Sequence, residues 1–196
     1  MIRPALLALL LAAPALAEDP PPPRPQPPGE ICGDALLVGT TLPAIDGAGE
    51  CGVAAPVLVA AAAGVVLEPP ATVACGAAKA LAAWLGAVKP AFPAGLAAIT
   101  VVDAYSCRNR NREKDGKLSE HALGNAIDIA AFRRGDGSTL AVGAGWKDAG
   151  DGPLLRRLHA AACGPFGTVL GPEANALHAD HLHLDVEARR SGPYCE

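Results

Sequence analysis

Residues 178–185 read HADHLHLD, and the alternation of polar and apolar side chains in this stretch predicts a β-strand. Successive side chains of a strand point to opposite faces of its sheet. His181, His183 and Asp185 would therefore share one face, while the leucines between them point into the core. A strand of this kind suits a sheet whose outer face lines a cleft.

Further strands and helices alternate irregularly along the rest of the chain. Runs rich in β-favouring residues predict strands at residues 57–59, 65–67, 98–102, 126–130, 139–142 and 168–170. Apolar residues at helical spacing predict a helix over Thr72–Val88, and Pro153 suits the first turn of a second helix. The pair Pro69-Pro70 is expected to end the strand before it. Several close strand pairs favour an α+β domain with an antiparallel sheet.

The first residues have the composition of an export signal. Arg3 precedes an apolar run, and Ala15-Leu16-Ala17 has the small-x-small pattern that a signal peptidase recognises. The run is shorter than the about 20 apolar residues that span a bilayer. We expect residues 1–17 to be a signal peptide that leaves no membrane anchor after cleavage, and the protein to be secreted or periplasmic. The alternative is an uncleaved anchor.

A proline-rich segment follows this signal. The run DPPPPRPQPPG at residues 19–29 favours an extended conformation and cannot pack a core. We therefore expect residues 18–30 to be a linker and residues 31–196 to be the folded domain.

The charge balance bears on the partners of the chain. There are 16 Lys and Arg residues against 20 Asp and Glu residues. Binding to nucleic acid needs clustered basic residues, so we expect no nucleic-acid partner. A neutral peptide or glycan stays possible, and the oligomeric state stays open.

The six cysteines all follow the expected signal peptide. An even number of cysteines in an exported chain predicts three disulfides, and a thiolate metal site would need CxxC pairs that this chain lacks. Spacing alone does not choose among the pairings. As a working arrangement we take Cys32–Cys51, Cys107–Cys163 and Cys75–Cys195.

Four of the five histidines fall in two short motifs. The first, SEHALGNAID at residues 119–128, contains His121 and Asp128, and its Gly124-Asn125 pair can form the turn between them. The second is the stretch at residues 178–185. Imidazole and carboxylate groups are common zinc ligands. The residues therefore predict a metal site, in which the strand histidines are both ligands, or one ligand and one base.

These motifs resemble two related groups of proteins. The spacing His121-x6-Asp128 with HADHLH at 178–183 resembles the LAS group of zinc peptidases, which includes D-alanyl-D-alanine carboxypeptidases and murein endopeptidases. More narrowly, YSCRNRN at 105–111, SEHALGNAIDIAAF at 119–132 and FGTVLGPEANALHADHLHLD at 166–185 resemble the bacterial extensin-like C-terminal domain family. The resemblance implies a Hedgehog/D,D-peptidase-like α+β fold, with an antiparallel sheet flanked by helices and stapled by disulfides.

The resemblance also implies a ligand set. Carried over onto the matching positions, it makes His121, Asp128 and His183 the ligands of a Zn²⁺ ion. Three protein ligands leave one coordination position for water, as in catalytic zinc sites. Asp185 and Ser119 are candidates for orienting the ligands.

Four more residues receive catalytic roles from the resemblance. It implies His181 as the general base, His178 as a residue near the developing oxyanion, and Arg108 as a group that stabilises the oxyanion or holds the substrate. Another branch of the group has an acidic base at the position of Asp180. Strand alternation places His181 on the face of the ligand, which favours His181 as the base.

These expectations describe a zinc metallopeptidase of the bacterial cell envelope that cleaves an amide bond in the stem or cross-link peptides of peptidoglycan, as a D,D-carboxypeptidase or an endopeptidase. One alternative is a non-catalytic, zinc-stabilised module that binds peptidoglycan. Another is a purely structural envelope protein stapled by disulfides. The retention of His181, His178 and Arg108 favours the enzyme, because binding alone would not require them.

Overall fold

The computed structural model describes residues 28–196. The expected signal peptide at residues 1–17 and most of the expected linker at residues 18–30 lie outside the described residues. The first strand, β1, begins at Gly29, so the folded part starts within the last residues that we assigned to the linker.

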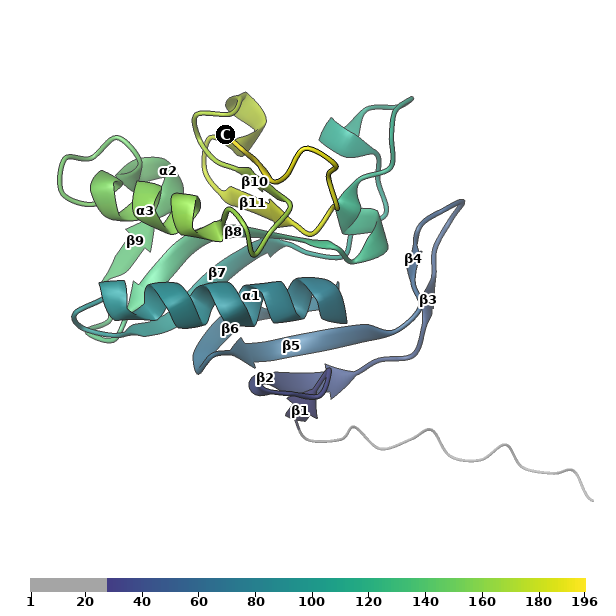
Figure 1. Cartoon of the computed structure of the whole chain (residues 1–196), viewed down its shortest axis with the longest axis horizontal. Coiled ribbons are helices and arrows are strands. Elements are labelled where there is room, and N and C mark those ends of the chain that lie inside the picture. Colours follow the sequence, from purple (N-terminus) through teal and green to yellow (C-terminus); the bar gives the residue numbers. More distant parts are fainter. Residues whose placement is uncertain (1–27) are drawn as a thin grey trace, which may run out of the picture.

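Ten strands in residues 28–196 form one mixed sheet, which Figure 1 shows crossing the molecule. Its neighbours are antiparallel except for the β6–β7 and β10–β12 pairs, which are parallel. In sheet order the strands are β1 (Gly29–Ile31), β2 (Asp34–Thr41), β5 (Pro56–Ala62), β6 (Val65–Ala74), β7 (Leu96–Asp103), β8 (Ala126–Arg134), β11 (Leu182–Asp185), β10 (Thr168–Leu170) and β12 (Tyr194–Cys195), with β9 (Thr139–Ala141) beside β8. The expected α+β class with a largely antiparallel sheet is confirmed.

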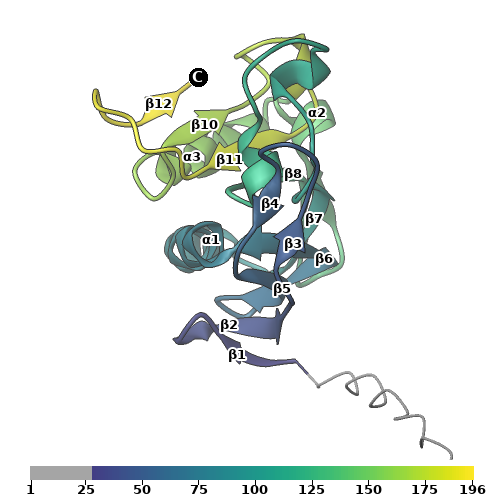
Figure 2. The ribbon, with the colours of Figure 1, turned by 90° about the vertical axis from the view of Figure 1, so that its right-hand side faces the viewer.

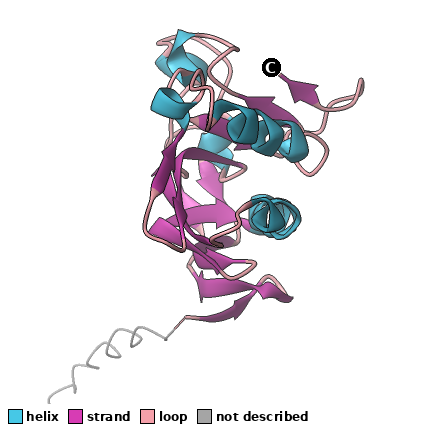
Figure 3. Ribbon diagram, turned by 90° about the vertical axis from the view of Figure 1, so that its left-hand side faces the viewer, coloured by secondary structure: helices cyan, strands magenta, loops and turns pink. Residues whose placement is uncertain are grey.

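Helices cover one face of this sheet. Figure 3 shows α1 (Cys75–Val88) and α3 (Gly152–Ala162) on the same side of the strands, and α2 (Val142–Gly145) is a single turn beside β9. Separate from the main sheet, β3 (Ile45–Asp46) and β4 (Gly52–Val53) form a small hairpin (Figure 2). Four 3₁₀ helices, at Lys89–Ala91, Arg110–Arg112, Glu120–Leu123 and Ala176–His178, complete the described part of the chain.

The core lies between the helices and the sheet. Trp84 of α1 is fully buried and packs edge-on against Phe132 of β8 and Phe166, with ring centroids 6.1 and 6.4 Å apart. Its indole Nε1 donates a hydrogen bond to the carbonyl oxygen of Leu158 on α3, at 3.0 Å. Trp84 therefore joins both long helices to the sheet.

The predicted strands and helices are present, but β6 is longer than predicted. It continues through Pro69-Pro70 to Ala74, and α1 begins at Cys75 rather than at Thr72. The pairing of β6 with β5 changes register between Val66 and Ala71, so the two prolines face no paired residue of β5. Proline is tolerated in a strand where no ladder hydrogen bond is needed, and our prediction of a strand end was therefore wrong.

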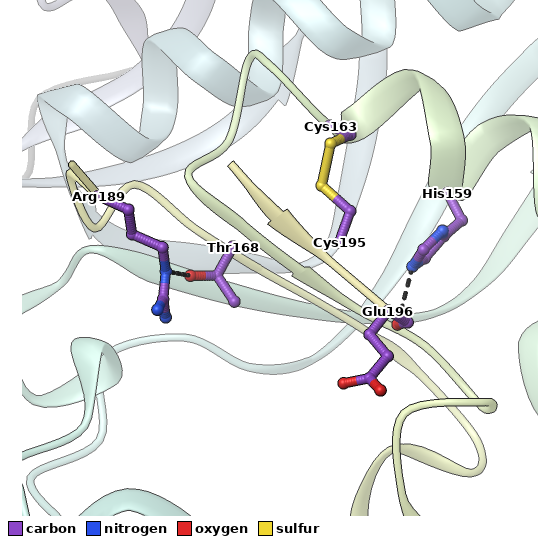
Figure 4. Close-up of a disulfide and its surroundings, with 6 residues drawn as sticks. All are labelled: His159, Cys163, Thr168, Arg189, Cys195 and Glu196. Carbon is purple, nitrogen blue, oxygen red and sulfur yellow. Dashed lines mark hydrogen bonds between the residues drawn. A yellow bond between two sulfur atoms is a disulfide. The ribbon is translucent and has the colours of Figure 1, made fainter. Parts of the chain in front are cut away.

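The disulfide arrangement also differs from our expectation. The bonds join Cys32 to Cys75, Cys51 to Cys107 and Cys163 to Cys195, so Cys32–Cys51, Cys107–Cys163 and Cys75–Cys195 were wrong. A disulfide needs Cα atoms within about 7 Å, and the fold sets these distances at 5.6, 5.5 and 6.0 Å for the three bonds. The parallel pairing of β12 with β10, for example, carries Cys195 to the end of α3 (Figure 4).

Three disulfides are typical of proteins that fold in an oxidising, extracytoplasmic compartment. Among the helices of residues 28–196, none combines the length and the apolar character needed to cross a membrane.

The two buried tryptophans allow a matched test of the core. The indole Nε1 of Trp146 has no hydrogen-bond partner among residues 28–196, unlike that of Trp84. We expect Trp84→Phe to lower the free energy of unfolding by about 1–2 kcal/mol more than Trp146→Phe, because only the first change removes a buried hydrogen bond. Urea unfolding of both variants measures this difference, and equal losses would contradict the assigned role of Trp84.

Candidate metal centre

The pairing of β8 with β11 sets the position of two site residues. Asp128 of β8 lies directly opposite His183 of β11 in the antiparallel register. Leu182 and Leu184 are fully buried on the other face, so the predicted alternation of this strand is confirmed. The sheet thus presents an imidazole and a carboxylate side by side.

A tight turn brings His121 to the same place. The hydroxyl of Ser119 accepts a hydrogen bond from the backbone N–H of His121 at 3.4 Å, at the start of the 3₁₀ helix Glu120–Leu123. Gly124 ends that helix in the left-handed conformation (φ 69°), and a Cβ there would lie 2.8 Å from a methyl group of Val53. The glycine therefore allows the chain to turn into β8, as the sequence predicted.

The three side chains converge on one point. His121 Nε2 lies 3.2 Å from Asp128 Oδ1 and 3.1 Å from His183 Nδ1, and the remaining edge of the triangle, from His183 Nδ1 to Asp128 Oδ1, is 2.8 Å. Metal–ligand bonds of about 2.0–2.2 Å in a tetrahedral site place ligand atoms about 3.3–3.6 Å apart. The triangle is slightly tighter than this, and a small outward movement of the side chains reaches it.

Outer contacts set the tautomers of the two imidazoles. His121 Nδ1 lies 2.6 Å from the carbonyl oxygen of Ala104, and His183 Nε2 lies 3.1 Å from Asp185 Oδ2. Because both partners only accept, the outer nitrogens carry the protons. When both rings are neutral, His121 Nε2, His183 Nδ1 and Asp128 Oδ1 are all hydrogen-bond acceptors, and they lie within 3.2 Å of one another. Three acceptors this close need a cation or a proton between them. The group can therefore hold a metal ion.

Protonation is the alternative to metal binding at this point. Burial lowers the pKa of His183, but hydrogen bonds to Asp128 and Asp185 outweigh that effect and raise the pKa to about 9. Burial alone would raise the pKa of Asp128, whereas its hydrogen bonds with His121 and His183 lower the pKa well below its usual range. At neutral pH a metal ion must therefore displace a proton from His183.

A third imidazole, that of His181, faces the carboxylate of Asp128. His181, just before β11, places Nε2 3.6 Å from Asp128 Oδ2. Its Nδ1 lies 2.8 Å from Asp180 Oδ1, and the Asp180 side chain is 84% exposed. Asp180 therefore orients His181 from the solvent side.

His178 lies beside these rings, with its centroid 5.3 Å from that of His181 and 5.7 Å from that of His183. Asn175 Oδ1 accepts hydrogen bonds from Leu177 N and His178 Nδ1, both at 2.9 Å. Burial, together with the nearby His183 and His181, lowers the pKa of His178 to about 4. At neutral pH this ring is uncharged in the metal-free protein, with its proton on Nδ1 and an acceptor at Nε2.

Arg108 approaches from the loop that follows β7. Its Nη2 lies 2.9 Å from Asp103 Oδ2, and the side chain is mostly buried. The neighbouring Cys107 is bonded to Cys51, which anchors this part of the loop. Arg108 is therefore held in a fixed position.

All seven expected site residues line one cavity of about 540 Å³. They are His121, Asp128, His183, His181, His178, Arg108 and Asp180. The fifth histidine, His159, lies outside the cavity and contacts the carbonyl oxygen of Glu196. Five residues of the site were not predicted from the sequence. Asp103 holds Arg108, and Asn175 orients His178. The other three, Arg189, Tyr194 and Glu196, belong to the cavity wall. For Tyr194 and Glu196 the only signal was strand alternation: both flank Cys195, so in a strand they share the face opposite to its side chain.

Comparison with known families agrees with the motifs. The family model described as "Extensin-like protein C-terminus" matches residues 34–196. The chain belongs to this family. The resemblance drawn from the sequence motifs is therefore confirmed. Searches of curated proteins and of solved structures found no match to the chain.

Asp185 offers a test of the metal centre that leaves the three ligands in place. We expect Asp185→Ala to weaken Zn²⁺ binding about 10- to 100-fold, because His183 loses the acceptor that fixes its tautomer. Asp185→Asn retains an acceptor oxygen and should lose less. Competition with a chromogenic chelator measures the affinities, and Asp136→Ala, in an exposed turn, is the control. Equal affinity in all variants would rule out this role of Asp185.

Metal affinity should also depend on pH with a defined sign. Below the pKa of about 9 for His183, each bound ion displaces a proton, so affinity should fall about tenfold for each pH unit. Chelator competition across this range measures the slope, and a flat profile would argue against histidine ligands.

Proposed function

We propose that the domain is an exported Zn²⁺-dependent hydrolase that cleaves an amide bond in the stem or cross-link peptides of peptidoglycan. The observation that carries the proposal is the arrangement of His181. Its Nε2 points at the carboxylate of the His121–Asp128–His183 group, inside a cavity that is open to a substrate.

The donor set favours zinc as the metal. Two imidazole nitrogens and one carboxylate oxygen suit a catalytic zinc site, in which one coordination position is left to water or substrate. A bound zinc ion supplies Lewis acidity, which polarises a carbonyl group and makes water more acidic. The carbonyl of Ala104 and the carboxylate of Asp185 hold the two imidazoles in the tautomers that such an ion needs.

His181 is the proposed general base. Its Nε2 accepts the proton of the attacking water and later donates it to the leaving amine. Asp180 accepts the hydrogen bond from Nδ1, which keeps the lone pair on Nε2 and stabilises the ring when it is protonated. The exposed position of Asp180 supports this orienting role over that of a base acting inside the cavity.

Arg108 and His178 contact the substrate in this proposal. The guanidinium of Arg108, held by Asp103, places a positive charge in the cavity wall and stabilises the negative charge that develops on the substrate oxygen. Asn175 fixes the proton of His178 on Nδ1, so Nε2 of the neutral ring accepts a hydrogen bond from a substrate N–H. Of these two residues, Arg108 is the better candidate for the oxyanion contact.

The choice of substrate rests on export and on the motifs. Three disulfides indicate an extracytoplasmic protein, and the expected signal peptide at residues 1–17 agrees with passage into the cell envelope. The metal and base motifs resemble those of zinc peptidases that act on the peptides of the wall. A cavity of about 540 Å³ is large enough for a few peptide residues.

Digestion of purified peptidoglycan tests the proposal. Residues 18–196 in oxidised form should bind one zinc ion and release new peptide fragments, measured by metal analysis and mass spectrometry. We expect His181→Ala to keep the zinc but to slow fragment release at least about 100-fold, because proton transfer is lost. His159→Ala, a histidine outside the cavity, should cleave at the normal rate.

Two other outcomes would contradict the hydrolase. A protein that binds zinc and cosediments with peptidoglycan without releasing fragments would be a binding module. A protein without stoichiometric zinc, and unchanged by chelators, would be a structural protein of the envelope.

A further inference from the structure

The cavity continues beyond the metal centre along the same face of the sheet. In the register of β8, β11 and β10, Leu170 lies next to His183, and Thr168 lies next to Asp185. Tyr194 of β12 is in turn paired with Thr168. These neighbours all line the cavity together with Arg189 and Glu196. The sheet thus forms a floor that leads from the metal ligands to a distal end at β12.

The distal end is held firmly in place. Cys195 points toward α3 and forms the bond with Cys163 (Figure 4). Its neighbours Tyr194 and Glu196 line the cavity. The backbone N–H groups of these two residues donate hydrogen bonds to the carbonyl oxygens of Gly167 and Val169, both at 2.9 Å. The disulfide and the hydrogen bonds therefore fix the backbone that carries the exposed side chains of Tyr194 and Glu196.

The charged side chains that line the cavity near β12 form ion pairs, except for Glu196. Glu187 accepts hydrogen bonds from Arg110 at 2.8 Å and from Arg189 at 2.7 Å, and Arg110 also lies 3.5 Å from Glu120. These two guanidinium groups are therefore matched by two carboxylates. Glu196 forms no ion pair within residues 28–196, and its carboxylate accepts a hydrogen bond from the hydroxyl of Tyr194. The distal end thus carries a carboxylate that lacks a counter-ion.

We infer that Glu196 and Tyr194 form a subsite for a primary ammonium group on the substrate. This inference rests on the proposed peptide substrate. The Tyr194 hydroxyl donates to Oε2 of Glu196, which leaves Oε1 and the phenol oxygen as acceptors. A compact ammonium group with three donors fits these acceptors, whereas a guanidinium group prefers two free carboxylate oxygens. The Tyr194 ring, with Arg189 5.3 Å above it, forms the adjoining wall.

The distance from the metal centre indicates which part of a substrate reaches the subsite. Glu196 lies two strands beyond β11 in the sheet order, which is about 10 Å at the usual strand spacing. A long amino-bearing side chain, on a residue close to the bond that is cut, spans this distance. The subsite therefore selects peptides that carry a diamino acid with a free side-chain amine near that bond.

Paired peptides test the subsite by binding rather than by turnover. The probes are L-Ala-γ-D-Glu-L-Lys-D-Ala-D-Ala and the same peptide with the lysine amine acetylated. Calorimetric titrations use the His181→Ala background, so that the peptides are not consumed. We expect about fivefold tighter binding of the free amine, the size of a partly exposed ion pair. Glu196→Gln should abolish this preference, and the control Glu30→Gln, on β1 at the opposite edge of the sheet, should retain it.

The outcomes separate the subsite from the proposed hydrolase. Equal binding of the two peptides, binding of neither, or a preference that survives in Glu196→Gln overturns the subsite, even if the wild-type protein digests peptidoglycan. A preference that depends on Glu196 supports the subsite, even if no peptide bond is cut.

Discussion

The pairing of β8 with β11 is the constraint on which the site depends. It places a carboxylate and an imidazole opposite each other at a position where both are almost completely buried. Acceptor atoms held this close repel one another unless a positive charge lies among them. The sheet can therefore hold this pair only together with a bound cation or proton. The strand pairing that forms the sheet thus also determines that the site binds a positive charge.

Other segments supply the third ligand and orient the remaining histidines of the site. A glycine-terminated turn brings in His121, and the carbonyl oxygen of Ala104 fixes the orientation of its ring. Asp180 and Asn175 orient the two histidines nearest to the substrate space. Asp180 and Asn175 are close in sequence to the histidines that they orient, and Ala104 directly follows β7, the strand beside β8. The site is thus assembled mainly from short-range geometry at one sheet.

The sequence was informative where a local rule applied. Strand alternation placed His183 and Asp185 on one face, and the Gly124 turn followed from residue type. The disulfides could not be predicted, because the meeting of Cys32 with Cys75 depends on how distant elements pack. The continuation of β6 through Pro69-Pro70 was hidden for the same reason, since a register shift in the partner strand allows it. Glu196 escaped notice because the charge balance around it depends on arginines from other segments.

The disulfides have a consequence for chain topology. The bonds Cys32–Cys75 and Cys51–Cys107 enclose overlapping loops, and Cys163–Cys195 encloses a separate one. Residues 108–162 lie outside all three disulfide-closed loops. This middle segment contributes His121 and Asp128, whereas His183 lies in the loop closed by Cys163–Cys195. A metal ion held by these ligands would link residues 108–162 reversibly to the loop closed by Cys163–Cys195. No disulfide in the described residues joins these two segments.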